Sequence, residues 1–313
     1  MTRAMRLFPM ALLIGCGPVA TAPPEPMAPG VVFVSRGDPF LPGPLEVVQR
    51  DLKEGELGAP KPVRLTAPVT PGTYPVVQFQ HGFLSDRRGY DELLSHLASH
   101  GFVVVAPQMY PADGVPLGKE GAPDEARAAR RVAEWAHLNA ATVMGSAADP
   151  RPIGVAGHSR GGKVTWWLTA QEKYVTRGIV GVDPVDGKGG PLLSAQPESL
   201  PGPVETAPPS LIIGMEKGGS CAPEGDNFQH FFERTAPPTT LLVVKGQGHA
   251  DMLDADTTSG GLCFEGPNRA ETRRVTAGAM AAFFRWRLQD DQTARGFLES
   301  DLITTLEVTR ASR

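Results

Sequence analysis

The stretch GVAGHSRGGK, from Gly154 to Lys163, holds one serine between two glycines and decides the fold. Its centre matches the pattern G-x-S-x-G around Ser159, in which a strand turns sharply into a helix and exposes the serine hydroxyl. An ordinary glycine-rich turn is the other interpretation. The rest of the sequence distinguishes these two interpretations, because a nucleophilic serine needs a strand before it, a helix after it, and an acid and a histidine elsewhere in the chain.

Apolar patterning predicts that the serine lies between a strand and a helix. Residues 151–159 are expected to form a buried strand that ends at the serine, and residues 163–171 a helix. Apolar strands that alternate with helices are typical of the α/β class, with a mostly parallel central sheet and helices on both faces. Further strands are expected at 45–52, 61–69, 74–82, 102–110, 178–185, 209–216 and 239–246, and further helices at 88–101, 122–145, 227–233 and, closing the fold, 268–289.

Composition and charge restrict the class of partner. Of the 313 residues, 41% are hydrophobic and 20% are charged, which is typical of a globular chain with a sizeable core. No internal repeat indicates a second domain, so residues 31–313 are interpreted as one domain. A net charge of -4 gives no basic surface for nucleic acid, and we expect a monomer that takes a small-molecule substrate.

The N-terminus has the pattern of an export signal. Arg3 and Arg6 precede the apolar run LFPMALLIG, which is too short to span a bilayer but is typical of a signal peptide over residues 1–15. The run ends in LIGC, which resembles the lipobox of bacterial lipoproteins and makes Cys16 the expected lipidated residue. We expect an exported protein of the bacterial cell envelope, anchored to a membrane through lipid on Cys16. Secretion after signal cleavage is the alternative.

Residues 16–30 have the composition of a linker. Five prolines lie in the fourteen residues GPVATAPPEPMAPG that follow Cys16, and few apolar side chains are available for packing. Such segments prefer extended geometry, so this segment is interpreted as a tether.

Two further cysteines, Cys221 and Cys263, lie in the expected domain. An even pair of cysteines in an exported protein is more often bridged than free, so we predict a disulfide between them. Two unrelated thiols are the alternative.

A serine hydroxyl becomes a good nucleophile only beside an imidazole, which in turn needs a carboxylate to orient it. Among the seven histidines, His249 alone follows a C-terminal strand in a glycine-rich setting, KGQGHADML, and it comes after the serine in the chain. We therefore predict His249 as the base. The other histidines considered are assigned to helices (His96, His100, His137 and His230) or, for His158, to a position that points away from the site.

The acid has three candidates. Asp183 ends the strand that follows the serine helix, Asp186 comes three residues later, and Glu216 ends the next strand. Carboxyl ends of parallel strands meet at one edge of a sheet, where chemistry gathers in this fold class. Each candidate also fits a simple turn residue at a strand end, so the pattern leaves the choice open.

Acyl transfer also needs fixed N–H donors for the oxyanion. The amide of Arg160, directly after the serine, is one expected donor, and the amide of Phe83 in the loop HGF is the other. A tight turn at HGF and an anion site at Arg160 and Lys163 are the alternatives.

No cofactor or metal is expected. Asp251, Asp254 and Asp256 are conceivable calcium ligands, but their spacing matches no EF-hand loop. Two loops rich in proline and glycine, residues 110–123 and 187–208, are expected to rim or cover the site.

Five segments together resemble the chlorophyllases, which are esterases of the α/β-hydrolase fold that cleave the phytyl ester of chlorophyll. In chain order over residues 45–288, the segments begin with YPVVQFQHGFLSDRRGYDELLSHLASHGFVVVAPQMY and continue with GHSRGGK, GVDPVDG, CAPEGDNFQHFF and VVKGQGHADMLD. More distantly, HGF, LASHGFVVV and GHSRGG are similar to bacterial cutinase-like polyester hydrolases.

The resemblance implies a catalytic triad of Ser159, His249 and Asp183, with Glu216 second and Asp186 third as the acid. It implies a serine carboxylester hydrolase that forms an acyl-enzyme on an ester with an apolar group. A lipase or a cutinase-like polyester hydrolase is the alternative within the same chemistry. A catalytically silent binding lipoprotein is the alternative of another class.

Overall fold

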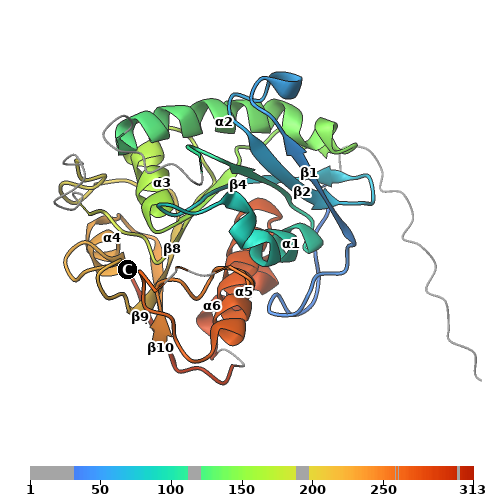
Figure 1. The fold of residues 1–313 in the computed structure, drawn as a ribbon. Coiled ribbons are helices and arrows are strands. Elements are labelled where there is room, and N and C mark those ends of the chain that lie inside the picture. The colour runs from blue at the N-terminus through green and yellow to red at the C-terminus, as the bar shows by residue number, and fades with distance from the viewer. Residues whose placement is uncertain (1–31, 112–120, 188–196, 258, 260, 302–303) are drawn as a thin grey trace, which may run out of the picture.

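The structure of the protein, a computed structural model, describes residues 32–111, 121–187, 197–257, 259, 261–301 and 304–313 (Figure 1). The predicted signal peptide 1–15, the lipidation site Cys16 and the tether 16–30 lie outside the described residues, as do parts of both predicted rim loops. In the described residues, no helix is long and apolar enough to cross a bilayer.

One nine-stranded sheet runs through the described residues, in the order β1-β2-β5-β4-β7-β8-β9-β10-β11. The inner strands β5, β4, β7, β8, β9 and β10 pair in parallel, whereas β1 with β2, β2 with β5, and β10 with β11 pair antiparallel. This is the expected mixed α/β architecture with a mostly parallel centre. The strands are β1 (Val47–Leu52), β2 (Val63–Pro68), β4 (Val76–Gln80), β5 (Val103–Pro107), β7 (Gly154–His158), β8 (Gly178–Val182), β9 (Ser210–Lys217), β10 (Thr239–Gly248) and β11 (Val308–Ser312).

Helices cover both faces of the sheet (Figure 1). The buried side chains of β5 show why, since Val103 and Val105 belong to one apolar cluster and Val104 and Ala106 to the other. Strands buried on both faces need a helical layer on each. The helices are α1 (Asp91–Ser99), α5 (Arg269–Leu288) and α6 (Gln292–Glu299) on one face and α2 (Ala122–Val143), α3 (Arg160–Ala170) and α4 (Phe228–Arg234) on the other.

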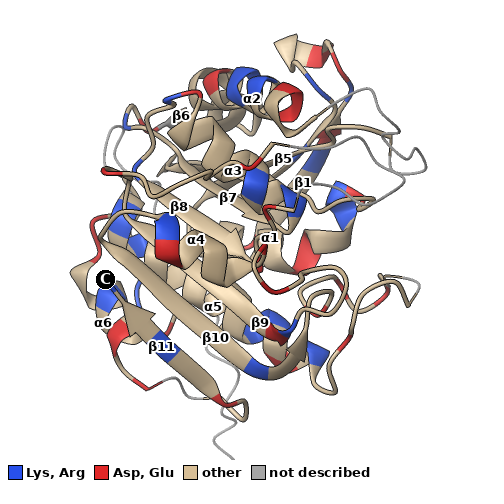
Figure 2. Ribbon diagram, turned by 90° about the vertical axis from the view of Figure 1, so that its left-hand side faces the viewer, with Lys and Arg blue, Asp and Glu red and all other residues tan. Residues whose placement is uncertain are grey.

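Local sequence signals explain the helix ends. The helix α2 begins with Pro123 in its first turn and with Asp124 and Glu125 next to its positive end. In α4, the side chain of Asn227 accepts a hydrogen bond from the amide of Gln229 and so caps the helix. Charged side chains lie mainly on helices and loops, whereas β7 and β8 carry none (Figure 2).

The chain does not close at the helix predicted over residues 268–289. The helix α6 and the edge strand β11 follow α5, and β11 pairs with β10. The residues of β11 are almost all exposed, and edge strands of this kind lack the apolar pattern that marks a buried strand. Small elements complete the described residues: η1 (Glu56–Gly58), η2 (Arg87–Tyr90), and the pair β3 (Thr73–Tyr74) and β6 (Ala147–Ala148).

Candidate active site

The sharp turn predicted at Ser159 is present between β7 and α3. Ser159 has φ 55° and ψ -122°, a conformation that non-glycine residues rarely adopt, and α3 begins at the next residue. Both glycines of the motif are required by close approach: a Cβ on Gly157 would lie 2.3 Å from the carbonyl carbon of Gly161, and one on Gly161 would lie 2.2 Å from Gln80 O. The motif is therefore a strand-turn-helix elbow and not an ordinary loop.

The register of β7 and β8 brings an acid next to this turn. His158 pairs with Val182, so Ser159 and Asp183 each come directly after the end of neighbouring strands. The amide of Ser159 donates to Val182 O at 3.1 Å. Asp183 is fully buried, and its Oδ1 accepts a hydrogen bond of 2.9 Å from the amide of Met215.

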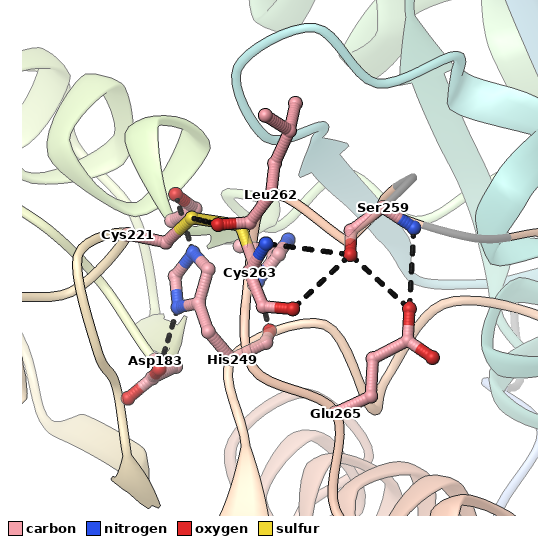
Figure 3. The surroundings of a disulfide bond; sticks show 9 residues. Asp183, Cys221, His249, Ser259, Leu262, Cys263 and Glu265 are labelled. Carbon is pink, nitrogen blue, oxygen red and sulfur yellow. Dashed lines mark hydrogen bonds and ion pairs between the residues drawn. A yellow bond between two sulfur atoms is a disulfide. The ribbon is translucent and has the colours of Figure 1, made fainter.

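His249 lies between the serine and this acid. Its Nδ1 is 2.6 Å from Asp183 Oδ2, and its Nε2 is 2.9 Å from Ser159 Oγ (Figure 3 shows the contact between His249 and Asp183). With the carboxylate accepting from Nδ1–H, Nε2 carries the lone pair that can take the serine proton. The structure thus brings together Ser159, His249 and Asp183, from the ends of β7, β10 and β8.

Glu216, the second candidate acid, lies elsewhere. It is exposed near the end of β9, and its carboxylate binds Lys245 Nζ at 3.0 Å and the amide of Gly246 at 2.9 Å. The hydrogen bond from Lys245 and then that from Gly246 lower the pKa of Glu216. These contacts join the exposed end of β9 to β10 where their pairing is irregular, and the partners of Glu216 in the described residues do not include His249.

Asp186, the third candidate, is buried in a different polar cluster. Its carboxylate accepts from His230 Nε2 at 2.9 Å and from the amides of Ser199 and Leu200, and Lys163 Nζ lies 3.4 Å away. Burial raises the pKa of Asp186, but the hydrogen bond from His230 and the charge of Lys163 outweigh it and lower the pKa. Asp186 thus fastens the segment that begins at residue 197 to α3, and Lys163 belongs to this cluster.

The predicted disulfide joins Cys221 and Cys263, with a Cα–Cα distance of 5.5 Å. Figure 3 draws His249 and Asp183 in the surroundings of this disulfide. In the segment that contains Cys263, the Ser259 hydroxyl donates hydrogen bonds to Cys263 O and to the Glu265 carboxylate. The disulfide therefore fastens the segment around Cys263, in which Phe264 O accepts a hydrogen bond from the amide of Ala250, next to His249.

The loop after His249 is held by two aspartates that were considered as calcium ligands. Asp251 accepts from the amides of Gly248 and Gly266, and Asp254 accepts from the amides of Asp91 and Glu92 at the start of α1. Burial raises the pKa of Asp254 to about 6. In the described residues, no group of three acidic, histidine or cysteine side chains is placed to hold a metal ion.

The HGF loop is held by polar contacts on both sides of Phe83. Tyr110 Oη donates to Gly82 O and accepts from the amide of Leu84, and His81 Nδ1 donates to Gly82 O at 2.8 Å. His81 Nε2 accepts from a backbone amide, which fixes this tautomer, and burial lowers the pKa of His81 to about 4. Leu84 has φ 58°, so the loop is bent tightly, and among the described residues no acceptor contacts the Phe83 amide.

Arg160 connects this loop to α2. Its guanidinium forms hydrogen bonds of 2.6 and 3.0 Å to Glu125 Oε1 and lies 5.7 Å from the centre of the Phe83 ring. Its amide lies at the start of α3, the positive end of that helix. The Phe83 and Arg160 amides thus belong to neighbouring segments that side chains hold in place.

Sequence reasoning missed four residues that contact the site or its supporting loops, among them Tyr90, whose hydroxyl lies 2.8 Å from His158 Nδ1, and it misplaced His158. The ring of His158 lies 4.7 Å from the ring of His249 instead of pointing away from the site. A lone buried tyrosine or glutamate in a helix or loop carries no recognisable pattern, and only proximity in the fold reveals it. The missed residues are Tyr90, Tyr110, Glu125 and Met215.

The sheet, the elbow at Ser159 and the polar side chains at the carboxyl edge define a hydrolase of the α/β-hydrolase class. The family profile described as Chlorophyllase matches residues 37–305. Chlorophyllase-2 of Arabidopsis thaliana is 32% identical over 260 residues, covering 74% of this chain and 79% of the relative. Chlorophyllase-1, chloroplastic, of Citrus unshiu is 33% identical over 244 residues, covering 72% of each. The chain belongs to the chlorophyllase family and is a carboxylic ester hydrolase.

Proposed function

We propose that the protein hydrolyses carboxylic esters through a triad of Ser159, His249 and Asp183. The observation that carries this proposal is the continuous pair of hydrogen bonds from Ser159 Oγ through His249 to Asp183, with all three side chains buried at the carboxyl edge of the sheet. Nucleophile, base and orienting acid are then in contact before substrate binds.

The mechanism follows from these contacts. Ser159 Oγ attacks the ester carbonyl while His249 Nε2 takes its proton, and Asp183 stabilises the imidazolium through Nδ1. The tetrahedral intermediate expels the alcohol, which takes the proton from Nε2, and leaves an acyl group on Ser159. Water then attacks the acyl carbonyl with His249 again as base, and the carboxylic acid leaves as the serine regains its proton.

The oxyanion is stabilised by the amides of Phe83 and Arg160. The Arg160 amide comes directly after the serine at the start of α3, and the HGF loop follows β4, which pairs with the serine strand β7. Losing one such donor typically costs about 100–1000-fold in kcat. Only the backbone amides of these two residues take part, and their side chains do not contact the oxyanion. The ion pair of Arg160 with Glu125 helps to hold Arg160 in place.

We propose an ester with an apolar group as the substrate class, with the phytyl ester of chlorophyll as the first candidate. Two observations support this. The relatives are named chlorophyllases, and exposed apolar side chains extend from the two segments that hold the site. These are Leu84 beside the HGF loop, 37% exposed, and Leu262 and Phe264 beside the disulfide, 68% and 48% exposed. Comparing rates on chlorophyll, p-nitrophenyl esters of increasing chain length, triglyceride and polyester discriminates chlorophyllase from lipase or polyesterase activity.

The direct test of the chemistry is hydrolysis of a short p-nitrophenyl ester by the parent and by Ser159→Ala. We expect the variant to lose about a millionfold in kcat, because removing the nucleophile alone costs about this much in a serine protease. Full activity in Ser159→Ala would contradict the proposal. A silent binding lipoprotein would instead show no hydrolysis by either protein and no reaction with a fluorophosphonate.

We also propose that residues 1–15 direct export, that Cys16 carries lipid, that 16–30 is a tether and that 31–313 is one monomeric domain. The charged start, the apolar run and the cysteine that ends it support this arrangement. Cys16→Ser should move the protein from the membrane fraction to the soluble fraction, and an unchanged distribution would contradict lipid anchoring.

A further inference from the structure

A continuous chain of hydrogen bonds joins the HGF loop to His249 behind the catalytic groups. The amide of Gly82 donates to Tyr90 Oη at 3.0 Å, Tyr90 Oη lies 2.8 Å from His158 Nδ1, and His158 Nε2 lies 3.0 Å from the backbone carbonyl oxygen of His249. Neither Tyr90 nor His158 contacts Ser159 Oγ in these bonds.

The chemistry of the groups fixes the direction of this chain. The carbonyl oxygen of His249 can only accept, so His158 Nε2 must carry a hydrogen. In the neutral imidazole, Nδ1 is then an acceptor and must receive the hydroxyl hydrogen of Tyr90. The hydroxyl oxygen is left to accept from the amide of Gly82, as the distances require. Each group in the chain is thus used in the only role open to it.

Burial holds the groups in these states. Tyr90 is fully buried and packs 5.0 Å from the ring of Phe79, and His158 is 3% exposed. Burial, followed by the charge of a protonated His249, lowers the pKa of His158 well below its ordinary value, so His158 stays neutral as the chain requires. Burial likewise raises the pKa of Tyr90 to about 12, so its hydroxyl keeps its proton.

The chain connects two parts of the site that come from distant strands of the sheet. The HGF loop follows β4, and His249 follows β10, which lies four strands away in the sheet. The amide after Gly82 is the proposed oxyanion donor, and His249 is the proposed base. A change of about 1 Å in the placement of either costs on the order of 100-fold in rate.

We propose that Tyr90 and His158 are positioning residues that set the distance between the oxyanion loop and the catalytic histidine. The proposal rests on the proposed function and adds to it two residues whose hydrogen bonds bypass Ser159 Oγ. Removing either should lower kcat while leaving KM nearly unchanged, because the contacts that bind the ground-state ester stay in place.

Matched variants separate positioning from packing. Tyr90→Phe keeps the ring and removes the hydroxyl that both neighbours use. Tyr74→Phe is its control, because Tyr74 is also fully buried and its hydroxyl donates to Thr70 O, away from the site. For the histidine, His158→Gln can place an N–H near the position of Nε2, whereas His158→Asn is one methylene shorter and cannot.

The measurement is kcat and KM for hydrolysis of a p-nitrophenyl ester. Each kcat is expressed per active site, and the concentration of active sites is determined by titration to completion with a fluorophosphonate. We expect Tyr90→Phe and His158→Asn to lose about 10–100-fold in kcat with KM within about twofold, and His158→Gln to recover part of the loss. The double variant Tyr90→Phe/His158→Asn should lose little more than either single variant, since all break one chain. Tyr74→Phe should keep the parent rate.

Equal losses in Tyr90→Phe and Tyr74→Phe, or equal rates in His158→Gln and His158→Asn, would overturn the inference and indicate packing alone. Ser159→Ala distinguishes this failure from failure of the proposed function. If Ser159→Ala is inactive while Tyr90→Phe and His158→Asn keep the parent kcat, the positioning role is wrong and the triad stands. If Ser159→Ala is active, the proposed function itself is wrong.

Discussion

The carboxylate of Asp183 lies 2.6 Å from Nδ1 of His249 and is completely buried. Its other oxygen is held by the amide of Met215, so the carboxylate cannot rotate away from the imidazole without losing a hydrogen bond. This relationship distinguishes Asp183 from the two acids that chain position also allowed.

Asp183→Asn should therefore lower kcat by about 10,000-fold, since an amide at this position favours the wrong tautomer of the histidine. Glu216→Gln is the matched control, and its kcat should stay within about twofold of the parent. Both rates are measured on a p-nitrophenyl ester. A large loss of kcat in Glu216→Gln, together with a parent-like kcat in Asp183→Asn, would show that Glu216 is the acid.

Asp186→Asn should affect stability more than catalysis. The substitution removes the charge that faces Lys163 and His230 in a buried cluster, and breaking a buried pair on one side typically costs about 3–5 kcal/mol. Urea unfolding should show this loss, while kcat per titrated active site changes by no more than a few-fold. A loss of kcat as large as that of Asp183→Asn would place Asp186 in the reaction instead.

His100 should make the protein less stable in mild acid. Burial, and then the charge of His96, lower the pKa of His100 to about 4 in the folded state, against about 6.5 in the unfolded chain. Between pH 6.5 and about 4 the unfolded state binds a proton that the folded state does not. The contribution of neutral His100 to folding stability is therefore complete above pH 6.5 and is lost as the pH falls to about 4. The full contribution amounts to about 3 kcal/mol.

The measurement is the free energy of urea unfolding between pH 4 and pH 7.5 for the parent and His100→Gln. The difference between the two proteins should shrink as the pH falls. The comparison is needed because the raised pKa of Asp254 acts in the opposite direction, losing stability as the pH rises from about 4 to about 6. A difference that does not depend on pH would refute the role of His100.

Removing the disulfide should destabilise the fold. The bridge closes a loop with a sequence separation of 42, and chain entropy predicts about 4 kcal/mol for a loop of this size. Cys221→Ser/Cys263→Ser should show this loss in thermal or urea unfolding, with Cys16→Ser as the control that leaves stability unchanged. Equal stability of the two variants would mean that the bridge does not form in the protein.

Much of the site could be predicted because its chemistry restricts the sequence locally. The turn at Ser159 needs glycines two residues away on each side, and a base is expected after a late strand, so pattern and chain order select Ser159 and His249. The structure brings their side chains to within 2.9 Å of each other. The acid could not be chosen in this way. Its choice depends on the pairing of His158 with Val182, which places Asp183 rather than Glu216 beside the serine.

The supporting side chains could not be predicted, because each is a single polar residue whose partner is distant in the sequence. Tyr90 and His158 are 68 residues apart, and Glu125 and Arg160 are 35 apart. The edge strand β11 was missed for a related reason, since it is held by backbone pairing to β10 and buries almost no side chain.

The most direct test of Ser159 as an activated nucleophile is covalent labelling with a fluorophosphonate, followed by intact-mass measurement and peptide mapping. Only a serine activated by a neighbouring base reacts readily with this probe. We predict one adduct per chain, on Ser159, that is absent in Ser159→Ala and forms much more slowly in His249→Ala. No adduct on Ser159, combined with ester hydrolysis that persists in Ser159→Ala, would contradict this prediction.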